Sequence, residues 1–451
     1  MRTGRVPRDG SRDETGWSDL MTFLHFDEAK PAAEMAVREW LGMMPQITNA
    51  LLVDDLFGKL RLAIWAPAPQ DTGSLEQVLR DKCQQWWSGE VLHVEQADAA
   101  TRDLYTATWS QGRPDPGEPR LVVLDRHRSR TTWFVNEEQP LWSAPDPHPP
   151  IVVFYSFKGG LGRSTILASF AIQRARAGER VCVLDFDLDS PGVGRLLASD
   201  SDGLTAQWGV LDFLVEQSAG KPPLSDYFHR CDRVAGAGEI VVFPAGNMND
   251  AYPDKLARVD MEEAPPAGES GLARLLKRVR DELKPQWILL DARTGISESA
   301  GRLLSGIAHL HVLLGTTQEQ SWQGLNIVLN RLGKERVLAG RSQAEAILVQ
   351  AMVPPGEAGK VAREVFLARA EREFTDRYYA EAVDDDQDEG MSWNTRDMDS
   401  LDAPHVAVPV DYDAKLASFG DIAEVAELLC AGPYAIIAER ITGRFAREAH
   451  E

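Results

Sequence analysis

A glycine-rich segment in the middle of the chain constrains the fold more than any other feature of the sequence. Residues 157–165 read FKGGLGRST and stand between a short apolar run, Ile151–Tyr155, and a helical stretch, Thr165–Ala177. Glycines at such a junction let backbone N–H groups point inward around a phosphate without Cβ clashes. The positive end of the following helix adds to this attraction. The segment therefore predicts a phosphate-binding loop that opens a helix.

The loop departs from the general pattern G-x-x-x-x-G-K-[ST] at two positions. Arg163 stands where that pattern has Lys, and Phe157 stands where it has the leading Gly. Because a guanidinium is a planar fork and not a compact point charge, Arg163 should attract phosphate oxygens, but hydrolysis could be altered. The Ser164 hydroxyl is a ligand suited to Mg²⁺. We expect these residues to contact the phosphates of ATP: Lys158, Gly159, Gly160, Leu161, Gly162, Arg163, Ser164 and Thr165.

The order of elements around this loop predicts an α/β fold. Apolar runs typical of buried strands recur along the chain, at residues 151–155, 180–184, 240–243, 287–290, 310–314 and 346–349. Helical stretches separate them, such as Gly271–Leu283 and Gln320–Leu332. Repeated alternation of strand and helix is typical of a doubly wound, mostly parallel sheet with helices on both faces. We expect this domain to span residues 148–432.

Two of the predicted strands end in aspartates. Asp187 belongs to the segment VLDFDLDSPG, and Asp291 belongs to WILLDARTG. Carboxylates at the carboxyl ends of strands lie where α/β sheets bind ligands. Asp187 could hold a magnesium-bound water or orient the attacking water, and Asp291 would bind Mg²⁺ through water, opposite Ser164. The sequence thus predicts a metal site of Ser164, Asp187 and Asp291, and a catalytic set of Asp187, Lys158 and Arg163.

The segment KGGLGRST resembles the deviant Walker A loop of the MinD/ParA group of P-loop ATPases, K-G-G-x-G-K-[ST]. Its arginine resembles a bacterial subgroup with the motif KGGVGR, found in multi-gene defence or signalling operons. The resemblance implies a nucleotide-dependent dimer in which Lys158 reaches the partner's phosphates and Asp187 orients water. DARTG resembles the DSRTG of that subgroup, which implies that Thr294 and Gly295 form switch II near the γ-phosphate. The base-contacting residues stay open, because the usual Asn is absent from Ala351–Pro355.

The residues before the proline-rich segment Ser143–Pro150 predict a separate domain. Residues 1–16 are expected to be a disordered leader, and residues 17–147 a small α+β domain that acts as an adaptor. Alternation at Leu60–Ile64 predicts a strand paired with Ala50–Val53 as a hairpin. We also expect a helix at Ser74–Trp87 capped by Ser74, and strands at 121–124 and 131–135. Eight of the 12 tryptophans lie here, either filling the core or offering a surface to a protein partner.

Two features mark the C-terminal part. Residues 382–402 are acidic and irregular, as expected of a solvated loop. In residues 433–451, Tyr434, Ile437 and Ile441 recur at helical spacing, with arginines opposite them. This amphipathic helix could lie on a membrane surface. The polar face also carries Glu439 and Glu448, which favours docking on the chain's own domain.

Composition narrows the classes of function. A formal net charge of −21 disfavours nonspecific DNA binding, which needs surplus Lys and Arg. Four scattered cysteines fit a reducing cytoplasm and predict neither disulfides nor a zinc site. The 451 residues contain no run of the roughly 18 apolar residues that a spanning helix needs.

Several functions agree with these patterns. The first is a dimerising ATPase switch of a bacterial regulatory or defence system, with ATP and Mg²⁺ as cofactors. The second is a nucleotide-dependent interaction module that does not hydrolyse, which the Arg163 substitution favours. A bacterial P-loop tyrosine kinase ranks low, because the eight tyrosines form no C-terminal cluster. DNA partitioning as in ParA ranks low on charge.

Overall fold

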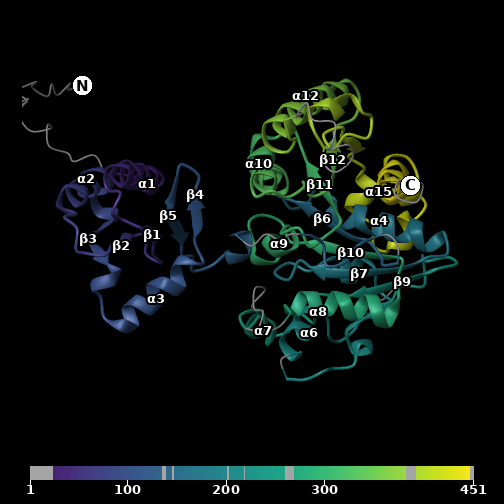
Figure 1. The fold of residues 1–451 in the computed structure, drawn as a ribbon. Coiled ribbons are helices and arrows are strands. Elements are labelled where there is room, and N and C mark those ends of the chain that lie inside the picture. Colours follow the sequence, from purple (N-terminus) through teal and green to yellow (C-terminus); the bar gives the residue numbers. More distant parts are fainter. Residues whose placement is uncertain are drawn as a thin grey trace, which may run out of the picture. The chain divides into compact units, whose positions relative to one another are not determined.

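The computed structural model describes residues 24–134, 139–144, 147–200, 203–217, 219–259, 269–381 and 393–446. The chain divides into two compact units, Met1–Arg128 and Ser129–Glu451 (Figure 1). The predicted leader, residues 1–16, lies outside the described residues.

The first unit is a small α+β domain, as expected. Its five-stranded sheet has the order β3-β2-β1-β5-β4. The elements are α1 (Phe26–Met43), β1 (Asn49–Asp54), β2 (Leu60–Trp65), α2 (Gly73–Cys83), η1 (Gln84–Trp86), β3 (Trp87–His93), η2 (Val94–Gln96), α3 (Ala99–Trp109), β4 (Arg113–Asp115) and β5 (Glu118–Asp125). The predicted hairpin is confirmed, since β1 and β2 pair antiparallel with Ala50 opposite Ile64.

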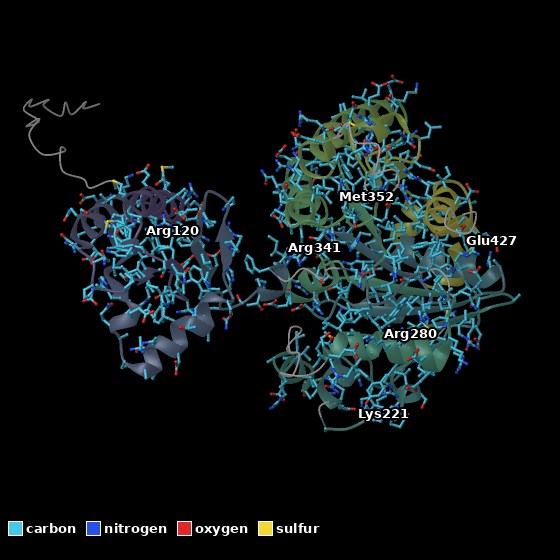
Figure 2. The ribbon with its side chains drawn as sticks, viewed as in Figure 1. Arg120, Lys221, Arg280, Arg341, Met352 and Glu427 are labelled. Carbon is cyan, nitrogen blue, oxygen red and sulfur yellow. The ribbon has the colours of Figure 1, made fainter. Side chains whose placement is uncertain are left out.

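The described tryptophans of the first unit pack in its two cores, and Trp17 lies outside the described residues. Trp40 and Trp87 are buried with α1 and α2 on one face of the sheet, and Trp65 packs against Trp109 of α3 on the other. These rings therefore do not form an interaction surface. Arg120 of β5 donates to the carbonyl oxygens of Leu41, Met44 and Ile47, which ties the end of α1 to the sheet (Figure 2).

The predicted capping of α2 by Ser74 is wrong. The helix begins one residue earlier, at Gly73, and Thr72 occupies the cap position without a capping side-chain hydrogen bond. The helix also ends at Cys83 and not at Trp87, because Trp87 opens strand β3.

The segment after Arg128 belongs to the second unit, so the domain boundary lies before the proline-rich segment. Thr131–Phe134 is the 3₁₀ helix η3 and not the predicted strand. The Thr132 hydroxyl donates to the Glu298 carbonyl oxygen at 2.7 Å, and the Trp133 indole donates to the Ser297 carbonyl oxygen at 2.7 Å. Arg331 donates to the Thr132 carbonyl at 2.9 Å. These side-chain hydrogen bonds satisfy the segment's polar groups without a neighbouring strand.

The second unit is built on a doubly wound sheet of order β13-β12-β11-β6-β10-β7-β9-β8, in which β8 alone among these strands runs antiparallel to its neighbour. The strands are β6 (Ile151–Ser156), β7 (Arg180–Phe186), β8 (His229–Arg230), β9 (Glu239–Phe243), β10 (Trp287–Ala292), β11 (Leu310–Gly315), β12 (Ala346–Val353) and β13 (Val408–Asp411). Each strand predicted in this unit after Ile151 is present. Both faces are covered by helices, so the central strands are mostly apolar.

Helices of the second unit form two layers (Figure 1). α4 and α15 pack with Val152 and Phe154 on one face, and α6, α8, α9, α10 and α12 pack on the other. The helices are α4 (Arg163–Arg176), α5 (Val193–Leu196), α6 (Val210–Glu216), η4 (Leu224–Tyr227), α7 (Tyr252–Leu256), α8 (Gly271–Arg278), η5 (Val279–Leu283, a π-helix), α9 (Glu298–Leu303), α10 (Glu319–Leu332), α11 (Lys334–Leu338), α12 (Glu357–Arg377), η6 (Thr395–Asp399), α13 (Ala414–Ala417), α14 (Ile422–Val425), η7 (Leu428–Cys430) and α15 (Pro433–Ala446).

Strand β6 lies at the point where the order of the sheet reverses. After β6 the chain forms β7, β8, β9 and β10, which all lie on one side of β6 in the sheet. It then crosses to the other side of β6 and forms β11, β12 and β13. Ligands of open α/β sheets bind outside the carboxyl ends of strands at such a switch point. The glycine-rich loop follows β6 and therefore lies at this position.

The C-terminal helix is docked on its own unit. Tyr434, Ile437 and Ile441 of α15 are buried in the core that α4 shares. The apolar face expected at a membrane is thus covered by protein. None of the helices among the described residues is both long and apolar enough to span a bilayer.

Residues 382–402, the acidic segment, only partly match the predicted solvated loop. Residues 382–392 lie outside the described residues. After them, the Trp393 indole packs on the core and donates to Glu345 at 2.7 Å, and Thr395–Asp399 forms η6. The end of the segment is therefore held against the second unit.

Two histidines in the core of the second unit, His311 fully buried and His309 partly buried, predict a loss of stability in mild acid. Burial lowers the pKa of both His309 and His311 to about 4. His309 accepts from the Ile151 N–H at 2.9 Å and contacts the Trp142 carbonyl at 2.7 Å. In the unfolded chain the two imidazoles take up protons near pH 6.5, whereas in the folded chain they do so only near pH 4. The stability that the neutral imidazoles contribute is therefore fully present above pH 6.5 and is lost as the pH falls towards 4.

At pH 5 the expected loss is roughly 2 kcal/mol for each histidine. Chemical denaturation of the full chain between pH 7 and pH 5 measures it, with His309→Gln as the matched variant, whose unfolding free energy should vary less with pH. An equal pH dependence in both proteins would contradict this assignment.

Candidate functional site

The loop between β6 and α4 leaves open space for an anion. Gly162 caps α4 in the left-handed region, at φ +82°, which a residue with a side chain rarely adopts. A Cβ built on Gly159, Gly160 or Gly162 would meet no other described atom within 4 Å. The N–H groups of the first turn of α4 face this region without intrahelical partners. Loop and helix together thus fit a phosphate group.

Phe157 takes the place of the usual leading glycine because α10 makes room for it. A Cβ on Gly324 would come within 1.9 Å of the Phe157 ring, so the ring lies directly on the backbone of α10. This contact between Phe157 and Gly324 was not predicted from the sequence. Its signal was a glycine inside an otherwise regular helical stretch.

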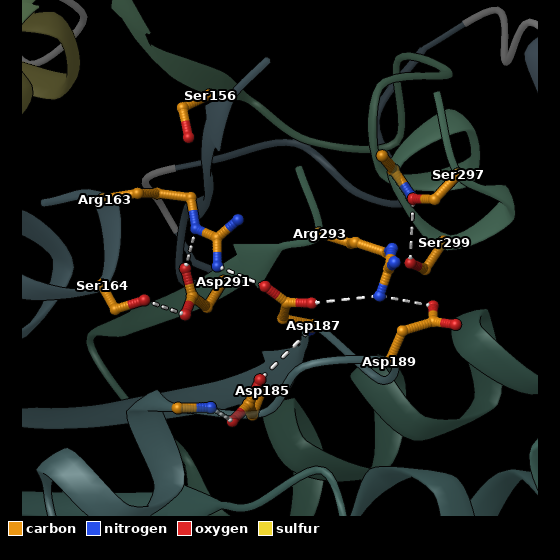
Figure 3. A network of polar contacts seen from close by, with 12 residues as sticks. Ser156, Arg163, Ser164, Asp185, Asp187, Asp189, Asp291, Arg293, Ser297 and Ser299 are labelled. Atoms are coloured by element: carbon orange, nitrogen blue, oxygen red, sulfur yellow. Dashed lines mark hydrogen bonds and ion pairs between the residues drawn. The ribbon is translucent and has the colours of Figure 1, made fainter. Parts of the chain in front are cut away.

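The Arg163 side chain forms a buried bridge between two carboxylates (Figure 3). Its Nε donates to Asp291 Oδ1 at 2.6 Å, and its Nη2 donates to Asp187 Oδ2 at 2.9 Å. Only 8% of the side chain is exposed. Burial disfavours the charged guanidinium, but Asp291 and Asp187 outweigh this and raise the pKa of Arg163. The third nitrogen, Nη1, is buried without a hydrogen-bond partner among the described residues.

Ser164 completes the predicted constellation. Its hydroxyl donates to Asp291 Oδ2 at 2.6 Å, so both oxygens of Asp291 are engaged. Asp291 ends β10 and is fully buried beside β6 and β7. The structure therefore brings together Arg163, Ser164, Asp187 and Asp291, from three separate places in the sequence. Thr165 lies in the first turn of the same helix.

Asp187 is flanked by a second arginine that the sequence analysis did not single out. Arg293 Nη1 lies 3.7 Å from Asp187 Oδ1 and 2.9 Å from Asp189 Oδ2 (Figure 3). Asp187 Oδ1 forms no hydrogen bond with any described residue. Arg293 stands within the DARTG segment, two residues after Asp291, so its position near the site could have been read from the motif.

Asp185 shapes the turn that presents Asp187. Its carboxylate accepts from the N–H groups of Asp187 at 3.1 Å, Gly192 at 3.1 Å and Gly194 at 3.3 Å. Burial, and after it the charge of Asp291, raise the pKa of Asp185. The first Asp of the D-x-D pattern is thus structural, because its side chain is fully buried and points into the turn.

Lys158 belongs to the loop, and Gly295, which together with Thr294 was predicted to form switch II, lies near the start of the loop. Lys158 Nζ donates to Gln318 Oε1 at 2.7 Å, within the same chain. The Gly295 carbonyl accepts from the Tyr155 hydroxyl at 3.3 Å, and Gly295 lies near the Phe157 carbonyl. Thr294 is partly buried next to it.

An open cleft of about 520 Å³ borders the loop on the side of Lys158. It is lined by Phe157, Lys158, Gly159, Gly160, Leu161, Thr316, Gln318, Gln320 and Met352. Met352 adopts φ +58° at an irregularity of β12 and is 42% exposed (Figure 2). Gln350, before it, donates to the Ala362 carbonyl at 2.9 Å. Arg163 and Ser164 are not among the residues that line this cleft.

The donors at the carboxyl edge of β7 and β10 fit a magnesium ion. A serine hydroxyl and carboxylate oxygens are the hard ligands that Mg²⁺ prefers, and Ser164 and Asp291 already lie within 2.6 Å of each other. Asp187 adds a buried oxygen that accepts no hydrogen bond from the described residues.

Sequence comparison finds similarity to an ATP-binding protein and to an Fe-S cluster assembly factor. No family model matches the chain. Over 209 residues, 44% of this chain and 70% of the relative, it is 23% identical to an uncharacterized ATP-binding protein of Methanocaldococcus jannaschii. Over 97 residues it is 33% identical to the cytosolic Fe-S cluster assembly factor cfd1 of Neurospora crassa. That second match spans 28% of the relative and 21% of this chain.

Solved structures with a similar arrangement include proteins of the ParA and MinD type. MinD of Aquifex aeolicus superposes with a TM-score of 0.41 and 15% identity, covering 65% of this chain and 97% of that one. A ParA family ATPase of Chlorobium tepidum gives a TM-score of 0.42 and 13% identity, covering 65% and 98%.

Proposed function

We propose that this chain, which is similar to MinD/ParA-type P-loop ATPases, binds ATP with magnesium and acts as a nucleotide-dependent switch. The observation that carries the proposal is the cluster of Arg163, Ser164, Asp187 and Asp291 beside an open glycine loop. Bound Mg²⁺ would be held by Ser164 and Asp291, with Asp187 nearby, and would neutralise phosphate charge. Asp187 would orient the attacking water.

In this proposal Arg163 exchanges partners when nucleotide binds. A triphosphate in the loop offers anionic oxygens to the guanidinium, whose Nη1 has no hydrogen-bond partner among the described residues. Release from Asp291 and Asp187 would free both carboxylates. The arginine thus serves as a tethered counter-ion for these carboxylates before nucleotide enters.

Calorimetry with ATP and MgCl₂ tests nucleotide binding directly. We expect saturable binding that requires Mg²⁺ and is competed by ADP. The Arg258→Ala variant is a suitable control, because Arg258 forms an exposed ion pair far along the chain from the loop. A folded protein with no affinity for any magnesium nucleotide would rule the proposal out.

Association of two chains is the expected consequence of ATP binding. We propose that Lys158 leaves Gln318 and reaches the phosphates of the second subunit. Sedimentation velocity should show a dimer with ATP and Mg²⁺ and a monomer without them. Lys158→Ala should bind ATP as a monomer and fail to dimerise, whereas Lys221→Ala, a lysine outside the site, should dimerise normally. The same association state with and without ATP would contradict this mechanism.

A second candidate is a nucleotide-dependent interaction module that does not hydrolyse. The observation that favours it is the same bridge: Asp187 is bound by Arg163, so it is not free to orient water unless the arginine moves.

With or without hydrolysis, we propose that the first unit contacts a protein partner, the downstream target of the switch. DNA partitioning remains opposed by the net charge of −21.

A further inference from the structure

Asp187 lies between two arginines, and only one of them belongs to the phosphate loop. Arg163 contacts one carboxylate oxygen at 2.9 Å, and Arg293 faces the other at 3.7 Å. The Asp187 side chain is 8% exposed. A charge buried to this degree is costly unless a cation stays beside it.

If Arg163 turns to the phosphates, Asp187 needs another partner. Arg293 is the other cation that the described residues bring within 4 Å of it. A shift of about 1 Å would convert the 3.7 Å separation into a direct charge-assisted hydrogen bond. Asp187 Oδ1 accepts no hydrogen bond from any described residue, so it is available for this contact.

Arg293 is held in place chiefly by the two aspartates that follow β7, Asp187 and Asp189. Arg293 forms ion pairs with Asp187 and Asp189. Among the described residues it donates no hydrogen bond to a backbone carbonyl. Its side chain is 29% exposed. Such an arginine contributes little to the core, unlike Arg331, whose guanidinium is buried against carbonyl groups.

We propose that Arg293 is a positioning residue that holds the Asp187 carboxylate in place after Arg163 has moved to the nucleotide. This inference rests on the proposed function, since it assigns Arg293 a part in the same hydrolytic step. Arg293 acts through Asp187 and does not itself contact the phosphates.

The test combines nucleotide affinity with a double-mutant cycle for turnover. Using full-length protein, binding of a fluorescent ATP analogue and release of phosphate are measured for the wild type, Arg293→Ala, Arg293→Lys, Asp187→Asn and the double variant Asp187→Asn with Arg293→Ala. Arg258→Ala serves as the matched control for loss of an arginine.

We expect Arg293→Ala to lower the turnover number about tenfold with nucleotide affinity unchanged. Arg293→Lys should recover part of the loss, because an ammonium can still pair with Asp187. In the Asp187→Asn background, removal of Arg293 should cause no further loss. Independent losses in the double variant, or weaker nucleotide binding by Arg293→Ala, would overturn the inference.

Different results would contradict the role of Arg293 and the hydrolytic function. If the wild type turns over ATP and Arg293→Ala does so at the same rate, only the role of Arg293 is overturned. Nucleotide binding without any turnover in the wild type would overturn the hydrolytic function, and the role of Arg293 with it.

Discussion

Replacing Asp291 by alanine is expected to lower the melting temperature of the nucleotide-free second unit by about 5–10 °C. The reason is the buried guanidinium of Arg163, which would keep one carboxylate partner out of two. Removing one partner of a buried ion pair costs about 3–5 kcal/mol. Ser164 would lose its hydrogen-bond acceptor as well. If Asp291 had no cationic partner, its replacement by alanine would instead raise the melting temperature, because it would remove an unpaired buried charge.

The same variant should also lose its response to nucleotide. Ligands that bind the folded state raise the melting temperature, so ATP with Mg²⁺ should stabilise the wild type and leave Asp291→Ala unchanged. Differential scanning calorimetry measures both effects in one series. Asp254→Ala removes an exposed carboxylate that pairs with Arg258, and it should change the melting temperature little. A nucleotide-free Asp291→Ala protein as stable as the wild type would show that the Arg163 bridge contributes nothing.

Replacing Asp187 by asparagine is expected to reduce phosphate release about 100-fold, with ATP binding largely preserved. Asparagine keeps the shape of the side chain but cannot take up a proton or carry the charge that orients water. Binding should survive because, in the proposed function, the loop and α4 would supply the phosphate contacts. Phosphate release under saturating ATP, measured beside a binding titration, separates the two quantities.

Asp254→Asn is the control for this experiment, since its carboxylate is 67% exposed and lies outside the loop. Equal phosphate release by Asp187→Asn and the wild type would favour the non-hydrolysing module. In that case Arg163 would stay on Asp187 even when nucleotide is bound, and the chain would signal through binding alone.

Local patterns determined much of the second unit. The run of apolar strands predicted the parallel sheet because strands buried on both faces must be mostly apolar. FKGGLGRST predicted the loop, since glycine at 162 is required for the φ of +82° that starts α4. The tail helix also followed from spacing, because Tyr434, Ile437 and Ile441 recur on one face. The boundary between units did not follow, because Thr132 and Trp133 reach partners more than 160 residues away.

The sequence by itself thus determined that this chain has a phosphate loop opening a helix, with aspartates 187 and 291 at the ends of strands. These features depend on backbone conformation and on periodicity, which neighbouring residues decide. Only the tertiary structure decided that Arg163 binds the two carboxylates, and that Arg293 stands on the far side of Asp187. The physical reason is that pairing of buried charges depends on which strand ends the sheet order brings together, and no local pattern contains that order.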